Sequence, residues 1–337
     1  MFNNLNKIIP ACILLIVGIC QGQTQLSGFV YSAEDSTALF GTSVYFDGTS
    51  IGVSTNEEGF YKIASSKESS SPLIISSLGF QKVTVSNYSG LNKIPDIYLK
   101  EKADNLDAVF VETDPWSRKK KLEIFQKEFL GKTSSASKCK ILNEEVLELN
   151  YRPSTKTLTA QANQDLIIKN RYLSYNIKYN LTNFEVKFRT GTSGLSLVHS
   201  VYYEGSSYFE ELRKNPRKKI FKNRKNSYSG SGLHFMRALA TKKLVENNFR
   251  IFHEKFQVSP YKFFEINNTG NFTKVKLLTS KISILYKDLE QSAFQTIGSF
   301  IIDEMGNHSP PNSIIFSGEI AHKRMAETLP LNYRIEN

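Results

Sequence analysis

Cysteine is scarce in this chain of 337 residues: there are three, and two of them, Cys12 and Cys20, fall in the first twenty positions. A scaffold held together by disulfides is therefore excluded, because only Cys139 remains in the rest of the chain. We expect Cys139 to be a buried free thiol. Beyond the N-terminus, no apolar run approaches the length of about eighteen residues that a membrane-spanning helix needs.

The N-terminus has the pattern of a secretory signal peptide. Lys7 precedes an apolar run that ends at Cys20, and this run is too short to cross a hydrocarbon core about 30 Å thick. Small and polar residues follow, so we place cleavage near Gly22 and predict that residues 1–22 are a signal peptide. Cys20 is an alternative lipid-acceptor site, but Ile19 stands where such a site has a small residue.

The chain is basic, with 43 Lys and Arg against 32 Asp and Glu and a formal net charge of +11. An exported basic protein is expected to meet an anionic lipid or glycan surface, or an envelope protein, rather than nucleic acid. The 40% hydrophobic content is enough for a sizeable core. The length suggests two domains.

Residues 24–101 consist of short β-prone runs separated by turns, without a helical period, which predicts a β-sandwich. Gly48 and Gly59 stand in turns, where residues that accept positive φ are needed. The segment Gly48–Gly52 formally matches the Gly-x-Ser-x-Gly motif of serine hydrolases. That motif requires a turn from strand to helix, whereas this segment lies between two strand-like runs, so we predict a hairpin turn.

Several of these runs carry the residues of a known family. The matching segments are Gly28–Val30, Phe40–Val44, Gly48–Gly52, Thr55–Tyr61 and Ile75–Phe80. In this pattern residues 24–101 resemble the carboxypeptidase regulatory-domain-like family, although Phe40 replaces the usual proline before the second strand.

The resemblance implies a transthyretin-like sandwich of seven strands. Such modules commonly begin the mature chain of exported proteins of the Bacteroidetes type, often ahead of outer-membrane receptors, so the expected location is the periplasm or the outer membrane. Residues 104–111 resemble the acidic segment that commonly follows the module. The zinc site of the carboxypeptidases is not implied, because no histidine has a glutamate three residues later and His-Glu-x-x-His is absent. We expect no metal and no cofactor.

Residues 102–136 are predicted to form a linker and an amphipathic helix. Asp114 and Pro115 mark its start, apolar residues follow at near-helical spacing to Phe129, and Gly131 is suited to the C-terminal cap. The basic run at its start is compatible with a helix on a membrane surface. Its apolar stripe is narrow, however, so we favour a helix that docks between domains and keeps its basic edge in solvent.

Residues 137–337 are predicted to form a larger β-rich α+β domain, which makes the whole chain mainly β with a few helices. The clearest helix spans Leu233–Asn247, and later strands are expected near Val275, Ile282, Phe294 and Ile314. The segments Phe129–Gly131, Cys139–Asn143, Asn223–Ser231 and His234–Arg237 resemble the C-terminal part of a group of exported Bacteroidetes proteins with the same leading module. That group brings no established activity.

The densest positive charge lies in the segment 213–225, which we interpret as an anion-contacting surface loop; a merely solvated loop is an equal alternative. His234 and Arg237, on adjacent turns of the predicted helix, are candidates for binding a carboxylate or phosphate, although a histidine at a helix start often only caps or packs. The candidate anion-binding residues are Arg217, Lys218, Lys219, Arg224, His234 and Arg237.

The sequence therefore favours an exported, non-enzymatic protein of the cell envelope whose β-sandwich serves in interaction or ligand binding. The alternative is an envelope hydrolase, a peptidase or glycan-processing enzyme, with its site in the C-terminal domain. It lacks a recognisable catalytic motif, but paired carboxylates leave no signature in one sequence. A subunit that passes substrates to an outer-membrane receptor is a third possibility.

Overall fold

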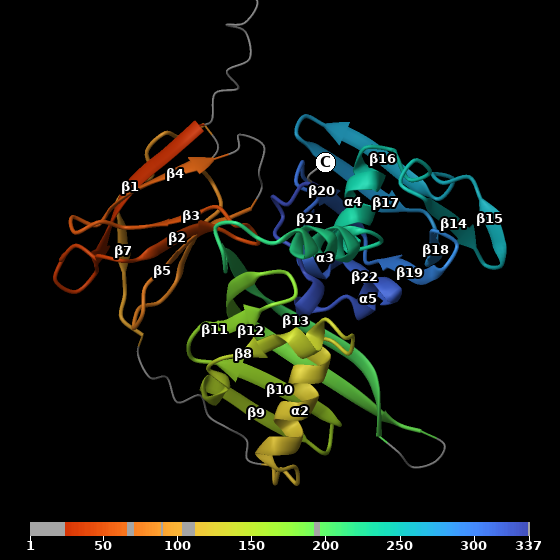
Figure 1. Ribbon diagram of the computed structural model, residues 1–337, viewed down its shortest axis with the longest axis horizontal. Helices are drawn as coiled ribbons and strands as arrows, with labels where there is room; N and C mark the ends of the chain where they lie inside the picture. The colour runs from red at the N-terminus through yellow and green to blue at the C-terminus, as the bar shows by residue number, and fades with distance from the viewer. Residues whose placement is uncertain (1–23, 66–70, 89, 103–111, 192–195, 336–337) are drawn as a thin grey trace, which may run out of the picture.

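The computed structural model describes residues 24–65, 71–88, 90–102, 112–191 and 196–335. The predicted signal peptide (1–22) and the segment 104–111 lie outside these ranges. Most of the regular structure is β-strand, arranged in three bodies that are coloured orange, yellow-green and cyan-blue in Figure 1. The predicted fold class, mainly β with a few helices behind an N-terminal sandwich, is confirmed.

The first body is a β-sandwich of two sheets, with strand orders β4-β1-β7 and β3-β2-β5-β6. Val30, Val44 and Ile75 belong to the one buried cluster that forms its core. The strands are β1 (Thr24–Ser32), β2 (Ser43–Phe46), β3 (Gly52–Ser54), β4 (Phe60–Ser65), β5 (Leu73–Ser76), β6 (Val83–Val85) and β7 (Ile97–Leu99).

The second body is a six-stranded antiparallel sheet covered on one face by helix α2 (Arg118–Phe129). Strand β12 is its centre: it pairs with β13 along one edge and with β11 and then β10 along the other. The strands are β8 (Cys139–Ile141), β9 (Leu147–Arg152), β10 (Thr157–Ala162), β11 (Leu166–Asn170), β12 (Tyr175–Thr190) and β13 (Ser196–Glu211), with short 3-10 turns η1 (Ala136–Lys138) and η2 (Glu144–Val146).

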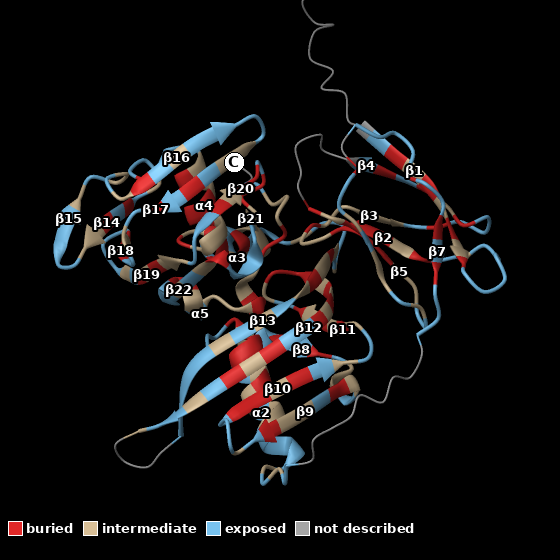
Figure 2. Cartoon of the chain, turned by 180° about the vertical axis from the view of Figure 1, so that it is seen from behind, coloured by how far each residue is buried: buried red, intermediate tan, exposed pale blue. Residues whose placement is uncertain are grey.

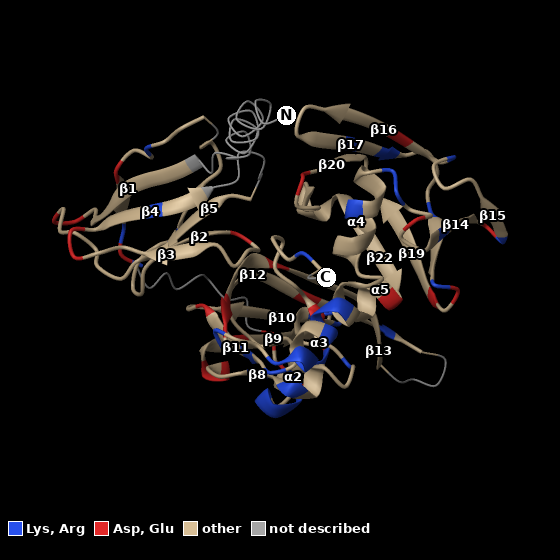
Figure 3. Cartoon of the chain, turned by 45° about the horizontal axis from the view of Figure 1, so that its top comes forward, with Lys and Arg blue, Asp and Glu red and all other residues tan. Residues whose placement is uncertain are grey.

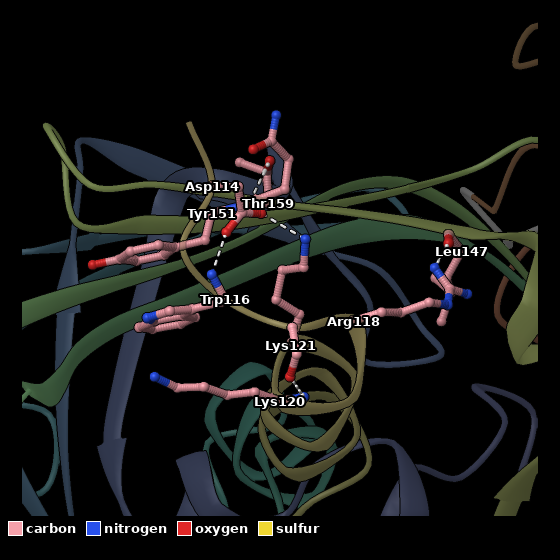
Figure 4. A network of polar contacts seen from close by, with 10 residues as sticks. Asp114, Trp116, Arg118, Lys120, Lys121, Leu147, Tyr151 and Thr159 are labelled. Atoms are coloured by element: carbon pink, nitrogen blue, oxygen red, sulfur yellow. Dashed lines mark hydrogen bonds and ion pairs between the residues drawn. The ribbon is translucent and has the colours of Figure 1, made fainter. Parts of the chain in front are cut away.

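Helix α2 docks within this body, on the face of its sheet, whereas the sequence predicted a helix that docks between domains. Phe125 and Phe129 are fully buried in the core, so its apolar face is covered by protein. At its start, Asp114 accepts hydrogen bonds from the backbone of Tyr151 and from Lys121, and the Trp116 ring stacks on Tyr151 (Figure 4). Arg118 and Lys121, two of the basic residues that suggested a membrane surface, therefore bind within the protein and hold the helix to the sheet.

Cys139, the first residue of β8, is a buried free thiol, as predicted. Burial raises the pKa of its thiol to about 12, which leaves it almost entirely protonated at neutral pH. Among the described residues no helix has the length and apolar character needed to cross a membrane.

The third body is a second sandwich, with strand orders β15-β14-β18-β19-β22 and β16-β17-β20-β21. Helix α4 (Gly232–Ala240) packs Phe235 and Leu239 into its core, and α3 (Lys218–Tyr228) leads from the middle sheet into α4. The strands are β14 (Phe249–His253), β15 (Phe256–Val258), β16 (Phe264–Thr269), β17 (Phe272–Leu277), β18 (Ile282–Tyr286), β19 (Glu290–Thr296), β20 (Ser299–Ile302), β21 (His308–Ser309) and β22 (Ile314–Gly318).

The C-terminal segment connects all three bodies. It begins with α5 (Glu319–His322) and the 3-10 turn η4 (Met325–Glu327). Another 3-10 turn, η3 (Pro311–Ser313), precedes strand β22 in the third body. The backbone N–H of Ala326 donates to Leu130 beside α2, and that of Leu331 donates to Gly48 of the first sandwich. Figure 2 shows buried residues both within each body and where the bodies meet.

Two local predictions need correction. The segment 213–225 is not a loop throughout, because α3 begins at Lys218. The predicted helix Leu233–Asn247 ends at Ala240, since Lys242 adopts a left-handed conformation (φ 53°) and turns the chain so that Leu244 enters the core. The four later strands lie where the sequence places them. Residues 137–337 contribute to two separate hydrophobic cores, and the domain boundaries stay predictions.

Candidate functional site

A hollow of about 490 Å³ lies where β11, the end of β13 and the start of α3 converge. Four cations line it, Lys169, Arg171, Arg213 and Arg217, together with Ser174, Leu212 and Ile220. We call this the basic pocket. None of the four takes part in an ion pair among the described residues. Glu211, close in sequence, is bound to Arg224 instead.

The start of α3 adds to the positive potential of the basic pocket. Arg217 is the N-cap residue, its side chain makes no capping hydrogen bond, and the first turn contains no acidic residue. Lys218 and Lys219 follow at once, so three cations stand at the positive end of the helix dipole, where carboxylates are favoured. Figure 3 shows Lys and Arg gathered along α3. A bound anion would relieve this repulsion.

The structure does not bring the six candidate residues from the sequence together. Arg217 lines the basic pocket, and Lys218 and Lys219 are exposed beside it on α3. Arg224 faces the other way: it is buried, lies over the Tyr175 ring, donates to the carbonyl of Leu173 and pairs with Glu211 at 2.7 Å. Its cation is therefore used to hold α3 on the sheet.

His234 and Arg237 are likewise reassigned to contacts within the protein. The His234 ring accepts a hydrogen bond from the Gly230 backbone and contacts Asn247 through Nε2 at 2.9 Å, and burial lowers its pKa. Each nitrogen of the Arg237 guanidinium donates to a backbone carbonyl, of Met305, Leu331 and Tyr333. Neither side chain points into the basic pocket.

Sequence reasoning missed Lys169 and Arg171 of the basic pocket. They lie on and just after a strand whose alternate residues Leu166, Ile168 and Asn170 are buried, so both point to the opposite, solvent-facing side of the sheet. Two basic residues two positions apart on a strand are a common pattern, so they do not indicate an anion-binding site in the sequence. Only the fold places them beside Arg213 and Arg217.

A second and larger cleft, of about 760 Å³, lies between the first sandwich and the middle sheet. The sandwich contributes Lys82, Lys102 and the turn Ser77–Phe80, and the sheet contributes Asp165 and Lys178. Asn143, Asn163, Gln164 and Asn180 also line it. We call this the inter-domain cleft. Among the described residues, no three His, Cys, Asp or Glu side chains come together as they would to hold a metal ion.

The turn that resembles a serine-hydrolase motif positions the two sides of this cleft. It is the hairpin between β2 and β3, as predicted, and it docks on the edge of β13. Gly48 donates to the carbonyl of Ser207 at 2.8 Å, and Thr49 accepts from Phe209 at 3.0 Å. The backbone N–H of Ser50 donates to Asn332 at 2.9 Å. The serine therefore joins two parts of the chain that are distant in sequence.

The profile of the family described as CarboxypepD_reg-like domain matches residues 26–111. The N-terminal sandwich is a CarboxypepD_reg-like domain. The resemblance noted in the sequence is thereby confirmed, and it covers the first body alone. A β-sandwich of this family suits an interaction module.

No curated protein matches this chain. Among solved structures, the complex Coh3ScaB-XDoc_M2ScaA of Acetivibrio cellulolyticus, a type II cohesin-X-dockerin complex, is similar at 15% identity over 34% of this chain and 79% of that one, with a TM-score of 0.21. A 9R-lipoxygenase from Cyanothece PCC8801 is similar at 10% identity over 66% of this chain and 49% of that one, with a TM-score of 0.19. Both TM-scores are too low to indicate a common fold.

Asp47 lies in the β2–β3 hairpin turn of the CarboxypepD_reg-like domain and gives a test of the contact between this turn and strand β13. Its carboxylate accepts a hydrogen bond from the backbone of Ser207 at 2.7 Å, and burial raises its pKa, although Lys82 nearby opposes the rise. A carboxyl group with a raised pKa in the folded protein contributes most stability below its unfolded pKa of about 3.9. This contribution is lost as the pH rises through the folded value.

We therefore expect Asp47→Asn to raise the melting temperature at neutral pH, because the amide keeps the acceptor oxygen without a buried charge. The gain should fade as the pH falls toward the unfolded pKa of aspartate, where both side chains are neutral. Melting temperatures across this pH range test it, with Asp96→Asn, an exposed carboxylate of the same domain, as the control. A variant less stable than the wild type at neutral pH would show that the attraction to Lys82 outweighs burial.

Proposed function

We propose that this protein is an exported, non-enzymatic protein of the cell envelope that binds an anionic group of an envelope glycan in the basic pocket. The observation that carries the proposal is the convergence of Lys169, Arg171, Arg213 and Arg217 on one hollow with no carboxylate paired to them among the described residues. Guanidinium groups bind phosphate and carboxylate through two parallel hydrogen bonds, so a pair of arginines favours such a group over a neutral sugar.

The cluster of cations at the start of α3 lowers the stability of the folded protein, and this supports a binding role. Like charges placed together at the start of a helix lower stability, and nothing in the described structure offsets them at α3. The start of α2 provides the contrast: it is also basic, but Asp114 accepts a hydrogen bond from Lys121, and backbone carbonyls accept hydrogen bonds from Arg118. A self-repelling cluster that the fold leaves unpaired is expected where an anion binds.

Export and the envelope location are part of the proposal. The signal-like pattern of residues 1–22 and the CarboxypepD_reg-like domain that follows support them. In an exported protein the accessible anions are phosphorylated or carboxylated glycans and lipid headgroups rather than nucleic acid. The domain then acts as the interaction module, and the basic pocket acts as the site for the anionic group.

The test is a calorimetric titration with N-acetylglucosamine 1-phosphate, comparing the wild type with the Arg213→Ser/Arg217→Ser variant. Hydrogen bonds to charged groups contribute about 1.5–3 kcal/mol each, so removing both guanidinium groups should weaken binding about a hundredfold or more. The wild-type affinity should also fall as salt is added, because the contacts are partly exposed. Arg152→Ser/Arg189→Ser, which removes two exposed arginines of the same sheet outside the pocket, is the control.

A second arm separates the two sources of such an anion. Vesicles that contain lipid A present the same phosphates on a surface, whereas the phosphosugar is free in solution. Loss of binding to both probes in the pocket variant alone supports the proposal, and binding to vesicles alone assigns the site to a lipid headgroup instead of a free glycan. The proposal would be overturned if the wild type bound neither probe, or if the control variant lost as much affinity as the pocket variant.

A further inference from the structure

The basic pocket is continuous with a basic face of the middle sheet. The residues of β11 that point away from α2 are Ile167 and Lys169, and Arg171 continues the same alternation. Lys140 of β8 lies directly opposite Lys169 in the antiparallel register. Side chains opposite each other on neighbouring strands are about 5 Å apart at Cβ, and like charges there lower stability. A row of cations thus leads out of the pocket across the sheet.

The same face leads into the inter-domain cleft. Ile167 lines the cleft and Lys169 lines the basic pocket, so residues that line the two hollows lie only two positions apart on the same face of strand β11. Lys178, opposite Ile167 on β12, lies at the near side of the cleft. Lys102 and Lys82 lie on its far side, in the CarboxypepD_reg-like domain. Cations from two bodies therefore follow one path over the surface.

Carboxylates oppose this path at its cleft end, where Asp165 and Asp47 both lie near Lys82. Among the described residues, Glu210 pairs with Lys178 at 3.2 Å, and Asp165 accepts a hydrogen bond from Asn180 at 2.8 Å. Lys140, Lys169 and Arg171 are in no ion pair there. Lys82 is held in place, because its ammonium group donates to Asn180 at 2.8 Å and to Ser206 at 2.7 Å. We call the path from the basic pocket to Lys102 the cationic track.

We infer that the ligand is an extended acidic polysaccharide, which occupies the basic pocket at one end and follows the cationic track along β11 into the inter-domain cleft. This inference rests on the proposed function and deepens it, because it names the ligand class and gives the CarboxypepD_reg-like domain a share of the site. The track from Ile167 through Lys169 to Arg171 covers four residue steps, about 13 Å at about 3.3 Å per residue, which exceeds a single sugar.

The composition of the cleft favours a polysaccharide over other polyanions. Side-chain amides of Asn163 and Gln164 are exposed there and suit sugar hydroxyls, and Phe80 offers an apolar surface for a ring face. A membrane surface is flat, so its headgroups cannot follow a path that enters a cleft between two bodies. A single-stranded nucleic acid needs a series of aromatic stacking platforms. The track contributes lysines and amides instead.

The experiment measures affinity against ligand length, using a digalacturonide and a long oligogalacturonide as probes on the full chain. The long probe should bind the wild type at least about tenfold more tightly than the short one, because it gains contacts along the track. The Lys102→Ser/Lys140→Ser variant removes two exposed cations of the track outside the basic pocket. It should lose this gain and leave the affinity for the short probe unchanged.

Two variants complete the design. Arg213→Ser/Arg217→Ser should weaken both probes, and Lys274→Ser/Lys276→Ser, exposed lysines of the C-terminal sandwich, should weaken neither. If short and long probes bind equally and the track variant has no effect, the inference is overturned while the proposed function stands. If neither galacturonide nor N-acetylglucosamine 1-phosphate binds, the proposed function fails as well. Tighter binding of an oligodeoxynucleotide of equal charge would overturn the polysaccharide assignment.

Discussion

Replacing Arg237 with methionine is expected to lower the free energy of unfolding by about 3 kcal/mol. The guanidinium donates to the carbonyls of Met305, Leu331 and Tyr333, at 2.8, 2.6 and 2.9 Å, and it lies over the Tyr228 ring. It thus joins α4 to the C-terminal segment, which in turn contacts the CarboxypepD_reg-like domain through Leu331. Methionine keeps much of the side-chain volume but supplies no donor.

Urea unfolding of the full chain measures this change. Arg250→Met is the matched control, because Arg250 is exposed and its one ion pair, with Asp288, contributes no more than about 1 kcal/mol. The Arg237 variant should keep the wild-type affinity for N-acetylglucosamine 1-phosphate under native conditions. A loss of stability no larger than that of the control would contradict the structural role assigned to Arg237, and a selective loss of affinity would return it to the binding site.

Gly52→Val is expected to separate the CarboxypepD_reg-like domain from the middle sheet. A Cβ atom at Gly52 would lie 2.6 Å from the Tyr208 ring, which is itself stacked on Tyr45 with ring centroids 5.0 Å apart. The ring cannot move aside without losing that contact, so the clash should cost about 3 kcal/mol or more at the junction. We expect a larger radius of gyration in X-ray scattering and faster proteolysis between the two bodies.

Ser54→Val is the control for this variant, because Ser54 lies on the same strand and is exposed. Far-ultraviolet circular dichroism shows whether the sandwich itself stays folded in both variants. Separation of the bodies with the β signal retained supports the docking role of the turn. An unchanged radius of gyration in Gly52→Val, with the fold intact, would show that other contacts hold the domain in place.

The fold was predictable where it depends on short stretches of sequence. Short strands and turn residues indicated the first sandwich, and the position of Gly48–Gly52 between two strand-like runs indicated a hairpin turn and not a nucleophile elbow. The partners of that turn were not predictable, since Ser207 is 160 residues from Asp47 and Asn332 is 282 residues from Ser50. Nothing in the local pattern distinguishes a turn that docks from one that faces solvent.

The candidate site was predictable in part for a similar reason. A run of basic residues indicated a cationic surface, and Arg217 lies in the basic pocket. Arg224 and Arg237 look the same in sequence, yet they bind backbone carbonyls, and a carbonyl acceptor has no residue signature. Lys169 and Arg171 are scattered residues that only the pairing of β11 with its neighbours brings into one site.

A crystal structure of the full chain, soaked with N-acetylglucosamine 1-phosphate at a concentration that saturates the titration, would show directly whether the basic pocket binds the anion. We expect phosphate oxygens within hydrogen-bond distance, about 3 Å, of the Arg213 and Arg217 guanidinium groups, with Lys169 and Arg171 on the opposite side of the anion. A phosphate bound elsewhere on the molecule, with none in the basic pocket, would contradict the assignment of the basic pocket as the anion site.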